Sequence, residues 1–232
     1  MKKKLLALLL LAGGVLGAKA QSIRPRVEVG GVMSVVEAKA GSLDLSSKAK
    51  LGYRVSAVAE IGFGSGVYIA PGITFKSQGG NYDLNNLGKM FGLTPSDADK
   101  AKTNRGHLNY NYLSVPVNLG FRAELSPRLG FSVEIGPYFA YALSGKAVIG
   151  SSDVNLFSMP DFAKKSLEFK RFDAGLNASV AVDYSGVIFR LGTEYGLTEN
   201  VKVQPLLENL LGPGSSASMK NFNAYTSVGF RF

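Results

Sequence analysis

Phe222-Asn-Ala-Tyr-Thr-Ser-Val-Gly-Phe-Arg-Phe232 ends the chain and decides how the rest of it is interpreted. Its even-numbered residues are apolar or nearly so, and the residues between them are polar or small. Because successive side chains of a strand point to opposite faces, this segment has one apolar and one polar face over a membrane-crossing length. We expect Phe230 and Phe232 to form a C-terminal signal that the barrel-assembly machinery recognises.

The same alternation recurs in seven earlier segments. They are Arg26–Val36, Leu51–Phe63, Val67–Lys76, Tyr112–Arg122, Leu129–Leu143, Arg171–Tyr184 and Val187–Leu197. A period of two sustained over this length does not fit a helix. The sequence therefore predicts an all-β fold, an eight-stranded antiparallel transmembrane β-barrel that occupies residues 21–232.

The connections alternate between short and long. Short ones are Gly64–Gly66, Ala123–Arg128 and Ser185–Gly186, and long ones are Glu37–Lys50, Ser77–Asn111, Ser144–Lys170 and Thr198–Asn221. Short periplasmic turns and long extracellular loops are typical of bacterial transmembrane barrels. Within the long loops, Leu84–Leu93 and Val201–Leu211 show weak helical patterns, which we interpret as surface segments over the rim.

The first 20 residues resemble an export signal. Three lysines precede an apolar run from Leu5 to Leu16, and Ala18-Lys19-Ala20 supplies the small residues that a signal peptidase reads. The alternative, an anchoring helix, is disfavoured because the apolar run is too short to span a bilayer. We therefore expect cleavage after Ala20 and an outer-membrane location.

Composition narrows the chemistry. The chain has no cysteine, which excludes disulfides and thiol catalysis. The signal segment carries four lysines and no acid, so its removal lowers the formal net charge from +9 to +5. The remaining basic residues are scattered, so we expect no nucleic-acid partner.

The polar face of the predicted strands carries almost all of their charges. These residues are Arg26, Glu28, Arg54, Glu60, Lys76, Arg122, Glu134, Arg171, Asp173, Asp183, Arg190, Glu194 and Arg231. The interior of an eight-stranded barrel is only wide enough for side chains to fill it, and unpaired buried charges are costly. We expect these groups to pair as a structural network that plugs the lumen. The alternative is a permeation or proton path.

Local geometry gives finer expectations. Pairing Tyr184 with Val187 places Asn177 opposite Glu194 and Ala181 opposite Arg190, with Asp183 as a diagonal neighbour of Arg190. Proline removes a donor from the ladder, so we expect bulges or pairing breaks at three residues within strands. These residues are Pro71, Pro116 and Pro137.

Several segments resemble the PorT-like outer-membrane β-barrel family of Bacteroidota-type bacteria. They are Tyr112–Val117, in which Ser114 stands where the family has an acid, Gly136–Lys146, Phe169–Leu176, Tyr195–Thr198 and Val228–Phe232. The resemblance implies an eight-stranded outer-membrane barrel. It implies little about activity, because members of this family are mostly uncharacterised.

Catalytic and metal-binding patterns are weak. His107 is the single histidine, and a lipid-modifying site would combine it with Ser114 and with Glu134 or Glu194. Asp97 and Asp99 lack the later ligands of a calcium loop, so no metal or other cofactor is expected. Lysines in the loops are diluted by acids, which favours a mixed solvated surface.

We therefore expect a monomeric, non-enzymatic barrel in contact with outer-membrane lipid and lipopolysaccharide. Its loops would serve envelope structure, adhesion or binding of an unidentified extracellular or envelope protein. One alternative is a narrow channel or an accessory to protein secretion, and another is a lipid-modifying enzyme. A soluble, lipocalin-like barrel would share the alternation but turn its apolar face inward.

Overall fold

The computed structural model describes residues 22–40, 43–44, 46–83, 105–149, 152–158, 167–198, 201–203 and 217–232. Eight long strands carry the fold: β1 (Ser22–Ala40), β3 (Lys50–Gly64), β4 (Val67–Asp83), β5 (Arg105–Ser126), β6 (Leu129–Ile149), β9 (Phe172–Tyr184), β10 (Val187–Gly196) and β12 (Ala217–Arg231). Short strands are β2 (Leu43–Asp44), β7 (Ser152–Asn155), β8 (Leu167–Phe169) and β11 (Val201–Val203).

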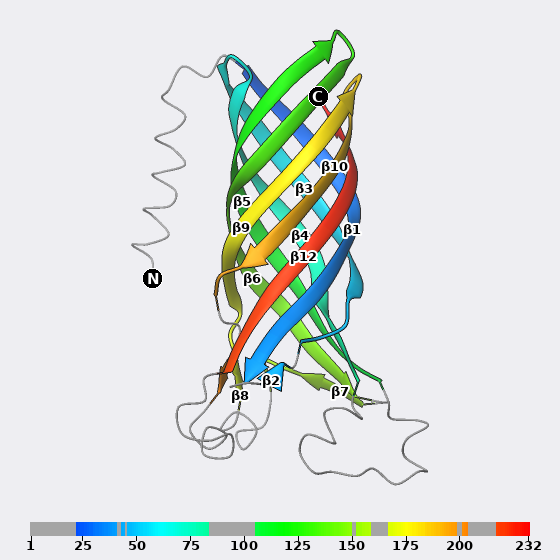
Figure 1. Ribbon diagram of the computed structural model, residues 1–232, viewed down its shortest axis with the longest axis vertical. Helices are drawn as coiled ribbons and strands as arrows, with labels where there is room; N and C mark the ends of the chain where they lie inside the picture. The colour runs from blue at the N-terminus through cyan, green and yellow to red at the C-terminus, as the bar shows by residue number, and fades with distance from the viewer. Residues whose placement is uncertain are drawn as a thin grey trace.

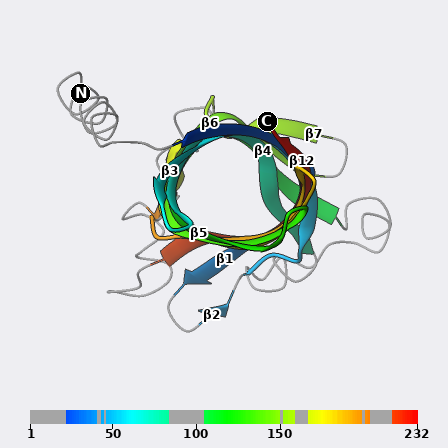
Figure 2. The ribbon, with the colours of Figure 1, turned by 90° about the horizontal axis from the view of Figure 1, so that it is seen from above.

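The long strands form a closed antiparallel barrel. Each pairs with its neighbours in chain order, and β12 pairs with both β10 and β1. The closing ladder extends from Arg26 opposite Arg231 to Ala40 opposite Ala217. Figure 2 shows the resulting ring in end view. The predicted eight-stranded all-β barrel is therefore confirmed.

Short turns gather at one end of the barrel. Figure 1 shows the β5–β6 and β9–β10 turns at the same end as the C-terminus. Ser65 and Ser185 have positive φ angles of 53° and 52°, which suit tight hairpin turns. Because β5 continues to Ser126, its turn is shorter than the predicted Ala123–Arg128 connection. We call this end the turn end and the opposite one the loop end.

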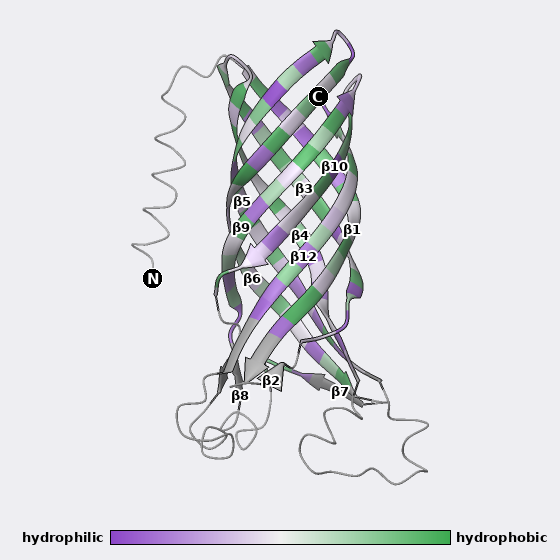
Figure 3. Cartoon of the chain, viewed as in Figure 1, coloured by the Kyte–Doolittle hydropathy of each residue, from purple (hydrophilic) through white to green (hydrophobic). Residues whose placement is uncertain are grey.

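The barrel is apolar outside and polar inside. Buried and exposed residues alternate along β9 and β10, and Figure 3 shows the matching alternation of hydropathy along the strands. Outward residues such as Phe189 and Leu191 are exposed, whereas Ile188 beside Phe189 is buried. Ile61 departs from the predicted pattern because it is buried. A belt of exposed apolar side chains of this extent suits a lipid environment.

Several strands are longer than their apolar patterns. β4 continues to Asp83, β5 begins at Arg105 and β6 continues to Ile149, so parts of the predicted loops Ser77–Asn111 and Ser144–Lys170 are strand. The helical interpretation of Val201–Leu211 is wrong at its start, because Val201–Val203 forms β11 and pairs with β8. Leu84–Leu93 lies outside the described residues.

Gaps in strand pairing occur at the three prolines. The β3–β4 ladder omits Pro71, and the β4–β5 ladder omits the pairs that follow Pro71 opposite Val117. The β5–β6 ladder breaks after Pro116 and omits Pro137, which is paired with Leu176 on its β9 side. The register is the same on both sides of each gap, so these sites are pairing breaks. The prediction of bulges or pairing breaks at these prolines is therefore confirmed in its second form.

The predicted signal segment, Met1–Ala20, lies outside the described residues. Among the residues that are described, no helix has the length and apolar character needed to cross a bilayer.

Candidate functional site

The lumen contains a cluster of buried ions that we call the central cluster: Arg26, Glu28, Glu134 and Arg190. Glu134 of β6 accepts hydrogen bonds from Arg26 Nη1 at 2.7 Å and from Arg26 Nη2 at 2.9 Å. Arg190 Nη2 lies 3.1 Å from Glu134 Oε1. Glu28 Oε1 lies 2.8 Å from Arg26 Nε and 3.0 Å from Arg190 Nε. The two acids and two bases therefore compensate one another across β1, β6 and β10.

Glu60 organises the ions on the turn-end side of the lumen. It forms an ion pair with Arg26, and its Oε2 atom lies 2.6 Å from Arg122 Nη2 and 3.1 Å from Arg231 Nε. Arg231 also forms an ion pair with Asp183. Since Arg231 belongs to β12, these contacts join the closing strand to β3, β5 and β9.

Glu194 is the corresponding acid on the loop-end side. It is hydrogen-bonded to Lys76, and its Oε1 atom lies 3.6 Å from Arg54 Nη1. The Lys76 ammonium lies 4.6 Å from the centre of the Tyr138 ring, and the Arg54 guanidinium lies 3.6 Å from that of Tyr225. Both cations are therefore held between a carboxylate and an aromatic face.

Asp173 is held mainly by neutral donors. Thr198 Oγ1 donates to it at 2.8 Å, Asn221 Nδ2 at 3.0 Å and Tyr138 Oη at 3.4 Å. Arg171 does not join this group. Its guanidinium donates to the Ala142 carbonyl at 3.2 Å and lies 4.0 Å from the centre of the Phe157 ring.

The β9–β10 hairpin has the predicted register. Asn177 lies opposite Glu194, and Ala181 lies opposite Arg190. Asp183 lies opposite Ile188 and is thus the predicted diagonal neighbour of Arg190, but its ion pair is with Arg231, and Arg190 binds Glu28. A local hairpin rule could not detect these partners, since both come from strands distant in sequence.

Inward-facing tyrosines, which the sequence analysis overlooked, fill much of the lumen. Several register pairs place a tyrosine opposite a glycine, among them Tyr68–Gly120, Tyr110–Gly145, Tyr138–Gly175 and Tyr225–Gly192. A Cβ atom added to Gly120 would lie 2.3 Å from the Tyr68 ring, and one added to Gly192 would lie 2.4 Å from the Tyr225 ring. The missing side chains therefore make room for the rings. These tyrosines could have been predicted to fill the lumen, because they occupy inward positions of alternating strands.

The outer half of β4 narrows the lumen at the loop end. Ser77, Gln78, Gly79 and Gly80 are all buried, unlike the alternating residues of a simple barrel wall. The Gly79 amide donates to Ser34 Oγ at 2.8 Å, and that hydroxyl lies 2.8 Å from the Gly79 carbonyl. Figure 2 shows β4 running inside the ring.

Almost no free space remains among the lumen ions. The cavity bounded by the central cluster, Arg54 and Glu194 measures about 10 Å³. A volume of this size holds about one water molecule. Larger spaces of about 410 and 350 Å³ lie at the turn end. In the described part of the chain, the barrel is therefore open at the turn end and filled further in.

The residues considered for catalysis are not assembled. His107 and Ser114 lie on opposite faces of β5, and Glu134 and Glu194 are bound to basic side chains. Seven residues along a strand correspond to roughly 23 Å. The described residues also contain no cluster of three or more His, Cys, Asp or Glu side chains placed to hold a metal.

A closed antiparallel barrel with an apolar exterior and an ionic interior defines the class of bacterial outer-membrane β-barrels. The chain belongs to the outer membrane protein beta-barrel domain family, which it matches over residues 13–202. It is thus a bacterial outer-membrane protein.

Solved structures of outer-membrane proteins are similar to this chain at low sequence identity. A major outer membrane protein from Thermus thermophilus is 15% identical with a TM-score of 0.50, the match covering 91% of this chain and 100% of that one. Neisserial surface protein A is 13% identical with a TM-score of 0.45, covering 90% and 97%. Ail, the attachment invasion locus protein of Yersinia pestis, is 11% identical with a TM-score of 0.42, covering 90% and 98%. A search of curated proteins gave no match.

Proposed function

We propose that this protein is a non-enzymatic outer-membrane barrel with a side-chain-filled lumen, acting in envelope structure, adhesion or partner binding through its loop end. The observation that carries the proposal is the cavity of about 10 Å³ among the central ions. A hydrated ion needs more room than a single water molecule occupies. The lumen ions are accordingly assigned a structural role, to hold the strands in register.

Binding at the loop end is proposed because the longest connections between the strands occur there. Residues 84–104 connect β4 to β5, and residues 204–216 precede β12. Loops carried on a rigid scaffold are common sites of recognition. The finer resemblance to the PorT-like family stays a prediction, as do signal cleavage after Ala20 and the monomeric state.

Conductance across a planar bilayer tests the filled lumen. The purified, refolded protein should give no steady ion current. The contrary result is a steady current whose ion selectivity changes in Glu194→Gln but not in Glu37→Gln, because Glu194 is inside the lumen and Glu37 lies near the loop end. That result would favour the alternative function, a narrow channel or secretion accessory.

Partner binding is tested separately. A variant in which residues 84–104 are replaced by a short Gly-Ser linker should keep heat-modifiable gel mobility but no longer retain the protein partners that the intact protein captures from cells. Retention of the same partners would place binding elsewhere. Loss of heat-modifiable mobility would show that the segment supports the barrel.

A further inference from the structure

The turn end of the barrel contains a blind cup. Its main space measures about 410 Å³, and a second space of about 350 Å³ shares Arg24, Arg122 and Glu124 with it. Both end at the filled lumen. Volumes of this size are in the range of small-molecule sites. In bacterial transmembrane barrels the short turns face the periplasm, so the cup opens toward periplasmic solutes.

The charged side chains on the floor of the cup are buried and already paired with one another. The side chains of Glu60 and Arg122 are 2% and 9% exposed, and they are joined by a 2.6 Å hydrogen bond. The Arg122 guanidinium also lies 5.3 Å from the centre of the Tyr68 ring. These groups hold one another in place, so a ligand would meet a preformed surface.

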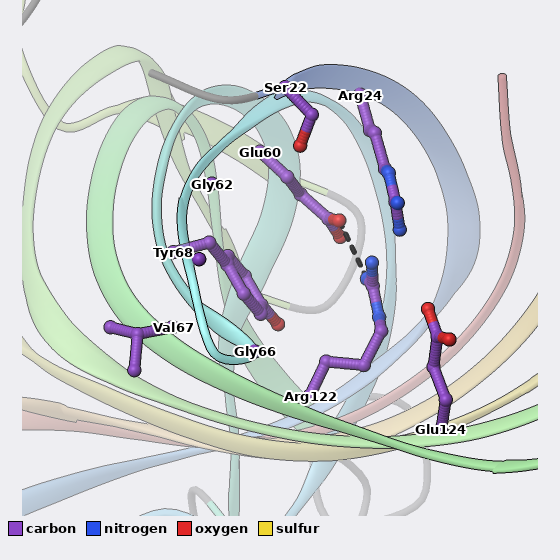
Figure 4. Close-up of a pocket in the computed structure, with 10 residues that line it drawn as sticks. Ser22, Arg24, Glu60, Gly62, Gly66, Val67, Tyr68, Arg122 and Glu124 are labelled. Atoms are coloured by element: carbon purple, nitrogen blue, oxygen red, sulfur yellow. Dashed lines mark hydrogen bonds and ion pairs between the residues drawn. The ribbon is translucent and has the colours of Figure 1, made fainter. Parts of the chain in front are cut away.

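Two charged side chains on the wall of the cup, Arg24 and Glu124, have no ion-pair partner among the described residues. Arg24 lies opposite Glu60 in the β1–β3 ladder, but Glu60 binds Arg26, Arg122 and Arg231. Arg24 on β1 and Glu124 on β5 are both exposed, and neither side chain forms a hydrogen bond or ion pair with another described residue. Figure 4 shows Arg24, Arg122 and Glu124 pointing into the same space. Arg24 and Glu124 therefore give the cup a free cation and a free anion, and the exposed Arg128 also lines its second space.

We propose that this cup binds a zwitterionic ligand that carries an ammonium and a carboxylate group, such as a short peptide with free ends. Arg24 would bind the carboxylate with its planar pair of donors, and Glu124 would accept the ammonium. A purely anionic ligand would be repelled by Glu124, and a purely cationic one by Arg24. The proposal is independent of whether the lumen conducts ions.

The test uses the refolded full-length chain in detergent micelles and the dipeptide Ala-Ala, with binding followed by NMR chemical shifts. The free dipeptide should bind saturably. Its N-acetylated and C-amidated forms, each lacking one charge, should bind about tenfold more weakly, which corresponds to the loss of one charge-assisted contact near a surface. In Arg24→Gln the amidated and free forms should bind equally, and in Glu124→Gln the acetylated and free forms should bind equally.

The controls are Glu37→Gln and Lys146→Gln near the loop end, which should leave binding unchanged. The proposal is overturned if no saturable shift occurs, if the blocked dipeptides bind as well as the free one, or if the control substitutions weaken binding as much as Arg24→Gln. Co-sedimentation with isolated cell-wall sacculi, reversed by the free dipeptide, would assign the ligand to peptide attached to the wall. Binding of the dipeptide without co-sedimentation would assign it to soluble peptide.

Discussion

At the scale of single residues, the buried ions stabilise the barrel only as a complete set. Moving a charge from water into the lumen costs several kcal/mol unless a partner compensates it. Glu134 is the most connected acid of the central cluster, since Tyr68 Oη at 2.8 Å and Asn118 Nδ2 at 3.1 Å also donate to it. Its removal leaves Arg26 with fewer partners and Arg190 with Glu28 alone among the acids of that cluster.

Glu134→Gln should therefore lower the free energy of unfolding by about 3–5 kcal/mol, the usual cost of breaking a buried pair on one side. Urea unfolding in lipid vesicles, followed by circular dichroism or gel mobility, measures the change. Glu124→Gln removes an exposed carboxylate and should stay within about 0.5 kcal/mol of the parent. Equal effects of the two substitutions would contradict the assigned network.

The glycine–tyrosine pairs give a second residue-scale prediction. Gly192→Ala places a Cβ atom 2.4 Å from the Tyr225 ring, whereas Gly130→Ala places one 3.6 Å from its nearest neighbour, Asp183 Cβ. Overpacking of this kind typically costs about 1–3 kcal/mol. The first variant should be destabilised by that amount in the same urea assay and the second should not. A larger loss of unfolding free energy in Gly130→Ala than in Gly192→Ala would contradict the idea that glycines make room for the tyrosine rings.

At the scale of elements, alternation located every long strand but not the strand ends. Gln78 and Tyr110 pair across the β4–β5 ladder beyond the apolar pattern, where both are buried. No outward apolar row marks this part of the two strands, so their sequence gives no period-two signal. Pairing of Val201–Val203 with Leu167–Phe169 was equally hidden, because each partner is only three residues long.

The end of the closing strand β12 allows the assembly signal to be tested separately from barrel stability. The Phe232 side chain is 70% exposed, and its ring packs on Phe230 with centroids 5.2 Å apart. Replacing both residues by alanine should reduce insertion into the outer membrane of cells severalfold, because the expected assembly signal is lost. Unaided refolding into detergent should change little, since both rings already face outward.

Phe189→Ala removes a similarly outward ring, 56% exposed, from the neighbouring strand β10 and serves as the control for apolar loss. It should insert normally in cells. If it fails as severely as the double variant, the effect reflects general loss of apolar surface and no terminal signal is needed.

At the scale of the whole molecule, closure decides which ions meet. Arg190 and Glu28 are 162 residues apart, and Ser227 and Glu28 are 199 apart, yet both donors reach the same carboxylate. Alternation predicts that these groups face inward because that depends only on residue parity. It cannot predict their partners, which depend on the stagger of the closing β1–β12 ladder. The fold was therefore largely predictable, whereas the arrangement of the lumen was not.

The central claim is that the apolar face meets lipid while the ionic face is enclosed. The chain has no cysteine, so single spin labels can be placed at Phe189 and Leu191, which face outward, and at Ala181 and Ile188, which face inward. In lipid vesicles, oxygen should relax the outward labels strongly, and a water-soluble nickel complex should reach neither pair. If the nickel complex relaxes the labels at Phe189 and Leu191 as it does those on a soluble protein, the apolar face is in water and the account is contradicted.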